Sequence, residues 1–115
     1  MVRTFIQTFE FSRKWDSLGM GDEDLRRLEN LIMENPKAAP VVQGTGGLRK
    51  IRFSYRKKGK RGGLRVCYVD FISYDAVYLI TVYSKNEKDN LSLSECKQIS
   101  EAIRLLESSL GDKNE

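Results

Sequence analysis

A basic segment between residues 44 and 65 constrains this chain more than any other feature of its sequence. The segment holds nine of the twenty Lys and Arg residues, and no Asp or Glu interrupts it. It contributes a charge of +9, whereas the remaining eleven basic and sixteen acidic residues sum to −5. Such a patch attracts a polyanion by electrostatic steering and by counterion release. We therefore expect a nucleic acid as the partner.

The basic residues alternate with apolar ones at the period of a β-strand. Ile51 and Phe53 alternate with Lys50 and Arg52, which predicts a strand with one face in the core and one basic face. A run of charges can also be a solvated loop without a specific role. The alternation favours a functional basic surface.

A glycine-rich piece from 56 to 63 follows, and it predicts the connection of a hairpin. The chain would return as a second strand from Leu64. If the register permits, Arg65 then lies near Lys50 or Arg52. The earlier glycine cluster at 44–47 matches neither the phosphate-binding loop nor the dinucleotide-binding fingerprint, because both need residues that are absent here. We interpret it as a turn that leads into the first basic strand.

The composition indicates one soluble domain. With 115 residues, 40% hydrophobic and 31% charged, the chain has room for a single core. We assign residues 1–110 to one domain and 111–115 to a flexible tail. No apolar run is long enough for a membrane helix and no signal peptide is recognisable, so we expect a cytoplasmic protein without a membrane partner. Cys67 and Cys96 are interpreted as small buried hydrophobes in a reducing compartment.

The chain contains no histidine at all. This absence excludes Ser-His-Asp and Cys-His catalysis, zinc sites built on His, and ribonuclease mechanisms that use a pair of histidines. Two isolated cysteines do not form a metal site either. We expect no metal and no cofactor, so that any chemistry rests on Lys, Arg, Tyr, Asp or Glu.

Apolar spacing and turn residues predict seven elements. Strands are expected at 3–9, 47–54, 63–71 and 76–83, and helices at 11–18, from Asp22 to Asn35, and from a capping box formed by Ser92 and Glu95 to about residue 106. The strand at 76–83 is apolar on both faces, which indicates a central position. The order β-α-α-β-β-β-α predicts an α+β domain with helices packed on a mostly antiparallel sheet.

Four blocks of the sequence resemble one known family. They are Asn-Pro-Lys (35–37), Gln-Gly-Thr-Gly-Gly-Leu-Arg-Lys-Ile-Arg (43–52), Gly-Lys-Arg-Gly-Gly-x-Arg-Val (59–66) and Tyr-Leu-Ile-Thr-Val-Tyr-x-Lys-Asn-Glu (78–87). In this order they resemble the HigB branch of the RelE-like toxins of bacterial type II toxin–antitoxin systems. The resemblance implies a compact RelE-like domain.

The resemblance also implies a function. Such toxins are mRNA interferases: they enter the ribosomal A site, cleave the mRNA there and inhibit translation. It implies three partners: the ribosome, the mRNA, and a cognate antitoxin with a helix-turn-helix DNA-binding domain. The toxin would reach operator DNA only through that antitoxin.

RNA cleavage by the neighbouring 2′-OH needs a base for its proton, a cation for the charge on the phosphorane, and an acid at the leaving 5′-oxygen. A lysine crowded by other cations has a lowered pKa and could be the base, and arginine is the better clamp for phosphate. In the RelE-like pattern two lysines of one strand and an arginine of the next do this work. The matching positions are Lys50, Arg52 and Arg65, with arginine replacing lysine at 52. This replacement favours transition-state stabilisation as the role of Arg52.

The HigB-like block after the last strand adds two candidate catalytic residues. Lys85 is expected beside Arg65 and the phosphate. Glu87 is expected to share the proton transfer or to orient a cation, or else to be a surface partner of Lys88 or Lys85. Tyr83 is a candidate for stacking on a base, although an aromatic residue at a strand end also suits the core. Contacts to the RNA backbone are expected from Arg49, Arg56, Lys57, Lys58, Lys60 and Arg61.

Two other functions fit the same sequence. One is a non-catalytic inhibitor of related fold, such as the ParE toxins that act on DNA gyrase, or a protein that only blocks the ribosome. The other is a simple nucleic-acid-binding module with a basic sheet. The combination of Lys50, Arg52, Arg65 and Lys85 favours the endoribonuclease.

Overall fold

The computed structural model of the chain describes residues 2–57 and 59–113. Within these residues it contains three α-helices, four strands and one short 3₁₀-helix at Ile72–Tyr74. The α+β class and the predicted order of elements are confirmed. The elements are β1 (Thr4–Gln7), α1 (Phe9–Ser17), α2 (Asp22–Glu34), β2 (Arg49–Lys57), β3 (Lys60–Phe71), β4 (Ala76–Ser84) and α3 (Leu93–Lys113).

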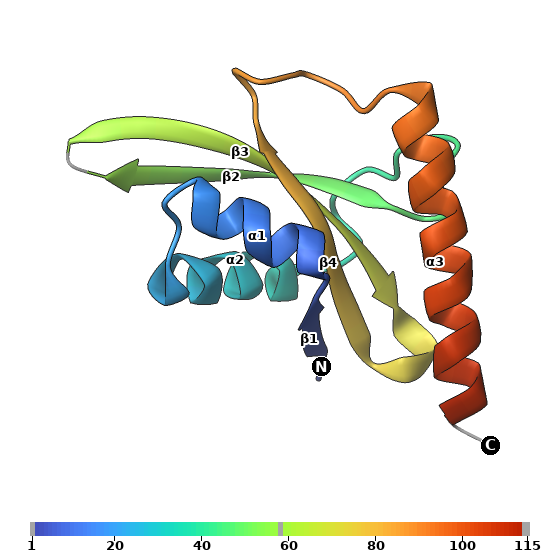
Figure 1. Cartoon of the computed structure of the whole chain (residues 1–115). Coiled ribbons are helices and arrows are strands. Elements are labelled where there is room, and N and C mark those ends of the chain that lie inside the picture. Colours follow the sequence, from blue (N-terminus) through green and yellow to red (C-terminus); the bar gives the residue numbers. More distant parts are fainter. Residues whose placement is uncertain (1, 58, 114–115) are drawn as a thin grey trace.

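The four strands form one mixed sheet in the order β1-β4-β3-β2. β1 is parallel to β4, and the other two neighbouring pairs are antiparallel. Helices α1 and α2 lie on one face of the sheet, and α3 lies on the other (Figure 1). β4 and the buried part of β3 from Val66 to Val69 are therefore covered on both sides, which explains the nearly continuous apolar sequence of β4.

Each face of the sheet carries its own apolar cluster. Under α1 and α2, the ring of Trp15 stacks on Phe11 with 5.3 Å between centroids and also contacts Phe53 at 5.8 Å. Under α3, buried Cys67 packs in the same cluster as Ile103. Burial raises the pKa of the Cys67 thiol to about 12, so this cysteine behaves as a small apolar residue.

The hairpin between β2 and β3 differs from the prediction. The expected connection from 56 to 63 is wrong, because β2 continues to Lys57 and β3 begins at Lys60. Gly59, with φ of 77°, lies in the turn. Gly62 belongs to β3 and pairs with Tyr55, whose ring passes so close that a Cβ on Gly62 would lie 2.2 Å from its Cζ. Gly62 therefore allows the Tyr55 ring to pack closely against the neighbouring strand, and it is not part of a loop. The hairpin projects past α1 and α2 (Figure 1).

The turn before β2 has the predicted character. The buried hydroxyl of Thr45 donates to the Val42 carbonyl at 2.6 Å and accepts from the Leu48 N–H at 3.1 Å. Gly44, Gly46 and Gly47 all have positive φ, which glycine adopts without strain. The cluster at 44–47 therefore closes a turn that leads into the basic strand.

Helix α3 begins as predicted and ends later than predicted. The Ser92 hydroxyl accepts from the Glu95 N–H at 3.0 Å, and the Glu95 carboxylate accepts from the Ser92 N–H at 2.9 Å. The helix continues to Lys113, so residues 111–113 are helical where we expected a tail; residues 114–115 lie outside the described residues. Of the helices in 2–57 and 59–113, none combines the length and the apolar character that crossing a membrane requires.

Candidate functional site

Three of the predicted catalytic cations line one pocket of about 480 Å³: Lys50, Arg52 and Arg65. Arg52 on β2 and Arg65 on β3 are direct register partners, and Lys50 lies two residues along β2, opposite Cys67. Because side chains two residues apart in a strand share a face, the three cations project from the same side of the sheet. The sequence predicted that Arg65 lies near Lys50 or Arg52, and in the structure its direct partner is Arg52.

The connection that precedes β2 forms one wall of this pocket, at Ala39 and Pro40. Arg49 holds this wall, since its guanidinium donates to the carbonyls of Lys37 at 2.9 Å and Ala39 at 2.7 Å. The backbone N–H of Lys50 donates to the Pro40 carbonyl at 3.1 Å. Arg49 thus supports the pocket wall, and its expected contact with RNA stays a prediction.

The opposite wall comes from the segment between β4 and α3, through Asp89 and Asn90. The Lys50 ammonium donates to the side-chain oxygen of Asn90 at 3.2 Å. Neither residue was singled out from the sequence. In the sequence, Asp89 and Asn90 are only two of several polar residues that follow β4. A polar segment of this kind does not show from its sequence which part of the fold it will contact.

Lys85 lies near this pocket but does not line it. It lines a neighbouring pocket of about 320 Å³, together with Arg61 and Asn86. Its backbone N–H points to the Gly63 carbonyl at 3.5 Å, which places it two residues along β3 from Arg65. Lys85 is exposed.

Glu87 is exposed in the turn after β4, where its backbone N–H donates to the Ser84 carbonyl at 3.0 Å. It lines neither of the two pockets. Its expected partner Lys88 instead contacts Glu95, with 2.5 Å between Nζ and Oε2. In the part of the chain that the structure describes, Glu87 forms no ion pair.

Tyr83 belongs to the core, which corrects its expected role as a platform for a base. Its side chain is 1% exposed and packs in the cluster under α3, while Lys88 Nζ lies 5.1 Å from the centre of its ring. Burial raises the pKa of its hydroxyl to about 12. Within the described residues this hydroxyl has no hydrogen-bond partner. A ring enclosed in this way has no free face for a nucleobase.

The remaining predicted RNA contacts lie along the projecting hairpin. Arg56 and Arg61 are exposed and stand opposite each other in the β2–β3 pairing, and Lys57 pairs with Lys60 in the same register. Lys58 lies outside the described residues. The like charges of Arg56 and Arg61, directly opposite each other, repel and are not retained for stability. This arrangement suits a surface that meets a polyanion.

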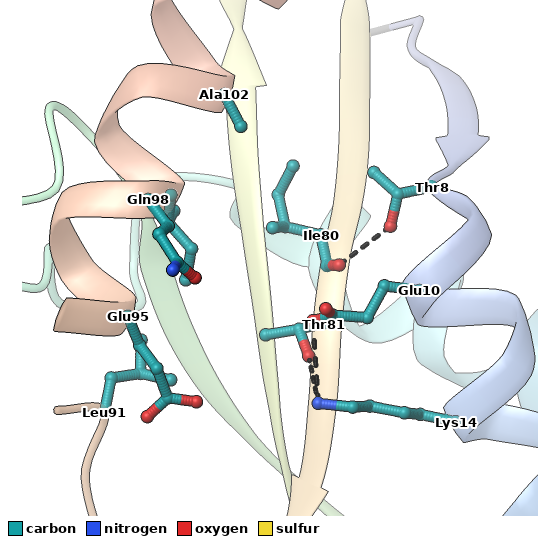
Figure 2. Close-up of a pocket in the computed structure, with 10 residues that line it drawn as sticks. Thr8, Glu10, Lys14, Ile80, Thr81, Leu91, Glu95, Gln98 and Ala102 are labelled. Atoms are coloured by element: carbon teal, nitrogen blue, oxygen red, sulfur yellow. Dashed lines mark hydrogen bonds and ion pairs between the residues drawn. The ribbon is translucent and has the colours of Figure 1, made fainter.

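A separate pocket of about 280 Å³ lies between α1, β4 and α3 (Figure 2). The Lys14 ammonium reaches from α1 to the Thr81 hydroxyl of β4 at 3.3 Å, and it lies 3.5 Å from the carboxylate of Glu10 on its own helix. Ile80 contributes apolar surface, and its carbonyl accepts from the Thr8 hydroxyl at 2.8 Å. The pocket is lined by two acidic residues, Glu10 and Glu95, and one basic residue, Lys14. None of the predicted catalytic residues, all of which the structure describes, lines it.

The described elements and their order give this chain the fold of the RelE-like toxins. Among solved structures it matches a mutant of the E. coli toxin RelE in the free state, with a TM-score of 0.54 and 19% sequence identity. The match covers 77% of this chain and 90% of that chain. No family model matches the sequence. The likeness therefore rests on the fold, and the resemblance to the HigB branch stays a prediction.

Proposed function

We propose that this protein is the toxin of a type II toxin–antitoxin pair and acts as a ribosome-dependent endoribonuclease. One observation supports this most: on a RelE-like fold, Lys50, Arg52 and Arg65 from two paired strands line a single open pocket. A purely structural role does not account for two arginines held opposite each other, because such a pair is repulsive.

The pocket suits metal-independent cleavage of a phosphodiester. The 2′-oxygen attacks the neighbouring phosphorus, the bond to the 5′-oxygen breaks, and negative charge builds on the phosphoryl oxygens. The guanidinium groups of Arg52 and Arg65 remain charged throughout and bind two oxygens at once, so they stabilise this charge in the transition state. Lys85, in the neighbouring pocket, binds an adjacent phosphate of the same strand.

The hairpin extends this surface toward a larger RNA. Arg56 and Arg61 are exposed on the projecting strands and contact the RNA backbone without reading its sequence. Ribosomal RNA at the A site supplies a dense array of phosphates for such contacts. We further propose a cytoplasmic toxin of the HigB branch, neutralised by a cognate helix-turn-helix antitoxin that also carries it to operator DNA.

Induced expression in a bacterial host, with and without the neighbouring open reading frame, tests this function. We expect growth arrest that the neighbour relieves, together with new mRNA 5′ ends confined to translated regions. Purified protein should cleave mRNA on programmed ribosomes, and Arg65→Ala should lose this cleavage while it still binds ribosomes. Arrest without new 5′ ends would instead indicate a gyrase-type or ribosome-blocking inhibitor. No arrest would indicate a nucleic-acid-binding module.

A further inference from the structure

The pocket that holds the three cations also contains one carboxylate, that of Asp89. Among the residues that line it, Asp89 is the only one with an acidic side chain. This matters for the chemistry because arginine does not give up its proton in proteins and therefore cannot accept one. A carboxylate accepts a proton at neutral pH without first having to lose one. The pocket thus contains a proton acceptor of a different kind from the lysine considered in the sequence.

The residues on either side of Asp89 both make contacts that anchor this segment. Lys88 is bound to Glu95 at the start of α3 and lies over the ring of Tyr83. On the other side, Asn90 accepts a hydrogen bond from Lys50 at 3.2 Å. These contacts fix the course of the chain on both sides of Asp89 and thereby place this residue at the pocket wall.

Asp89 shares the pocket with Lys50, Arg52 and Arg65 and forms no ion pair with any of these three described residues. Asp89 is also exposed. A pocket of about 480 Å³ is therefore lined by both a proton acceptor and phosphate-binding groups. A ribose and its 3′-phosphate need this arrangement for attack by the 2′-oxygen.

We propose that Asp89 is the catalytic residue that accepts the proton of the attacking 2′-OH, and that Lys50 donates a proton to the leaving 5′-oxygen. This inference rests on the proposed function. The bond from the 2′-oxygen to phosphorus forms as the proton passes to the Asp89 carboxylate. The bond from phosphorus to the 5′-oxygen then breaks as that oxygen takes a proton from the Lys50 ammonium. The products are a 2′,3′-cyclic phosphate and a 5′-hydroxyl.

The sequence offered a different carboxylate, Glu87, as one that could share the proton transfer, beside the alternatives of orienting a cation or pairing with Lys88 or Lys85. Glu87 is exposed in a turn and lines neither the Lys50 pocket nor that of Lys85. Asp89 is two residues further along, where the segment has turned back toward β2. Asn90 has a supporting role, because it fixes the Lys50 ammonium at the pocket wall.

The first test measures single-turnover cleavage of mRNA on programmed ribosomes. We expect Asp89→Asn, which keeps the size of the side chain and removes the proton acceptor, to slow cleavage by about 10²–10⁴-fold. Glu107→Gln, the same change of charge on an exposed position of α3, is the matched control and should cleave like the wild type. Ribosome binding and thermal melting of Asp89→Asn should stay at wild-type values. Cleavage by Asp89→Asn within threefold of the wild type, or a larger loss in Glu87→Gln, would overturn the assignment.

The second test separates a proton acceptor from a residue that only shapes the pocket. An mRNA with sulfur in place of the scissile 5′-oxygen carries a leaving group that needs no proton. With this substrate Lys50→Ala should recover most of its lost rate, whereas Asp89→Asn should stay slow. Recovery in Asp89→Asn, or none in Lys50→Ala, would overturn the two roles. If the wild type cleaves neither substrate, the proposed function itself fails, and that result is distinct from a failure of Asp89 alone.

Discussion

Arg52 and Arg65 lie directly opposite each other on two antiparallel strands, and both line the same pocket. Two like charges in this relation are destabilising by a few tenths to about 1 kcal/mol. The pair therefore lowers the stability of the fold, and residues that lower stability in this way are often retained because a functional site requires them.

Replacement of Arg65 should accordingly separate stability from activity. We expect Arg65→Ala to reduce cleavage by orders of magnitude, because it removes a phosphate clamp. Its free energy of unfolding should be unchanged or higher by up to about 1 kcal/mol, since the repulsion from Arg52 is relieved. Urea denaturation beside the cleavage assay measures both effects. A clearly destabilised variant would indicate that Arg65 has a structural role instead.

The hairpin charges should set the salt dependence of RNA binding. The double variant Arg56→Ala/Arg61→Ala should lower the slope of log K against log salt concentration by about 1.5, because each lost phosphate contact removes about 0.7–0.9. The control is Arg26→Ala/Arg104→Ala, which removes two exposed arginines from α2 and α3. Equal slopes in the two double variants would show that the hairpin has no special part in binding.

The contact between Tyr55 and Gly62 should make replacement of that glycine destabilising. A Cβ on Gly62 would lie 2.2 Å from the Tyr55 ring, so Gly62→Ala should lower the free energy of unfolding by about 1–3 kcal/mol. The neighbouring Gly63→Ala is the matched control, because a Cβ there meets nothing within 4 Å. Chemical denaturation of both variants decides the matter, and similar stabilities would contradict the predicted clash.

The ion pair at the start of α3 should give the protein an acid-sensitive contribution to stability. The Lys88 ammonium and the Ser92 backbone N–H hold the pKa of Glu95 at about 2, below its ordinary value of 4.5. A lowered pKa stabilises the folded state above pH 4.5, and this contribution disappears as the pH falls from 4.5 toward 2. Because the Glu95 side chain is 37% exposed and screened by solvent, we expect about 1 kcal/mol.

Comparison of Glu95→Gln with the wild type checks this prediction. The variant should be less stable at pH 7, and the difference should shrink toward zero near pH 2. Glu107→Gln, an exposed position of the same helix, should follow the wild type at every pH. A difference that does not change with pH would point to lost packing and not to the ionised carboxylate.

Two buried tyrosines should respond in opposite ways to removal of the hydroxyl. The Tyr83 hydroxyl has no partner within the described residues, so Tyr83→Phe should raise the free energy of unfolding by about 1 kcal/mol. The Tyr68 hydroxyl donates to the Pro36 carbonyl at 2.7 Å, so Tyr68→Phe should lower it by about 1–2 kcal/mol. Destabilisation of Tyr83→Phe would mean that its hydroxyl is bonded.

Local patterns predicted the elements well, because they depend on neighbours in sequence. The capping box of Ser92 and Glu95 and the pairing of Phe11 with Trp15 each span three or four residues, the spacing of one helical turn. The hairpin was predicted less well. Its three glycines suggested a loop, yet Gly62 belongs to β3 and lies against the ring of Tyr55 on the facing strand. A contact across strands has no signal in a local window.

The sequence by itself determined the basic strand, its alternation and the α+β order of elements, since charge and hydrophobic period can be read along the chain. Only the tertiary structure decided which side chains meet at the pocket. The β2–β3 register put Arg52 opposite Arg65, the packing of α3 enclosed Tyr83, and the segment after β4 brought Asp89 to the cations. Strand register, burial and the path of a loop depend on contacts between residues far apart in sequence. For this reason the position of Asp89 in the pocket could be recognised only from the tertiary structure.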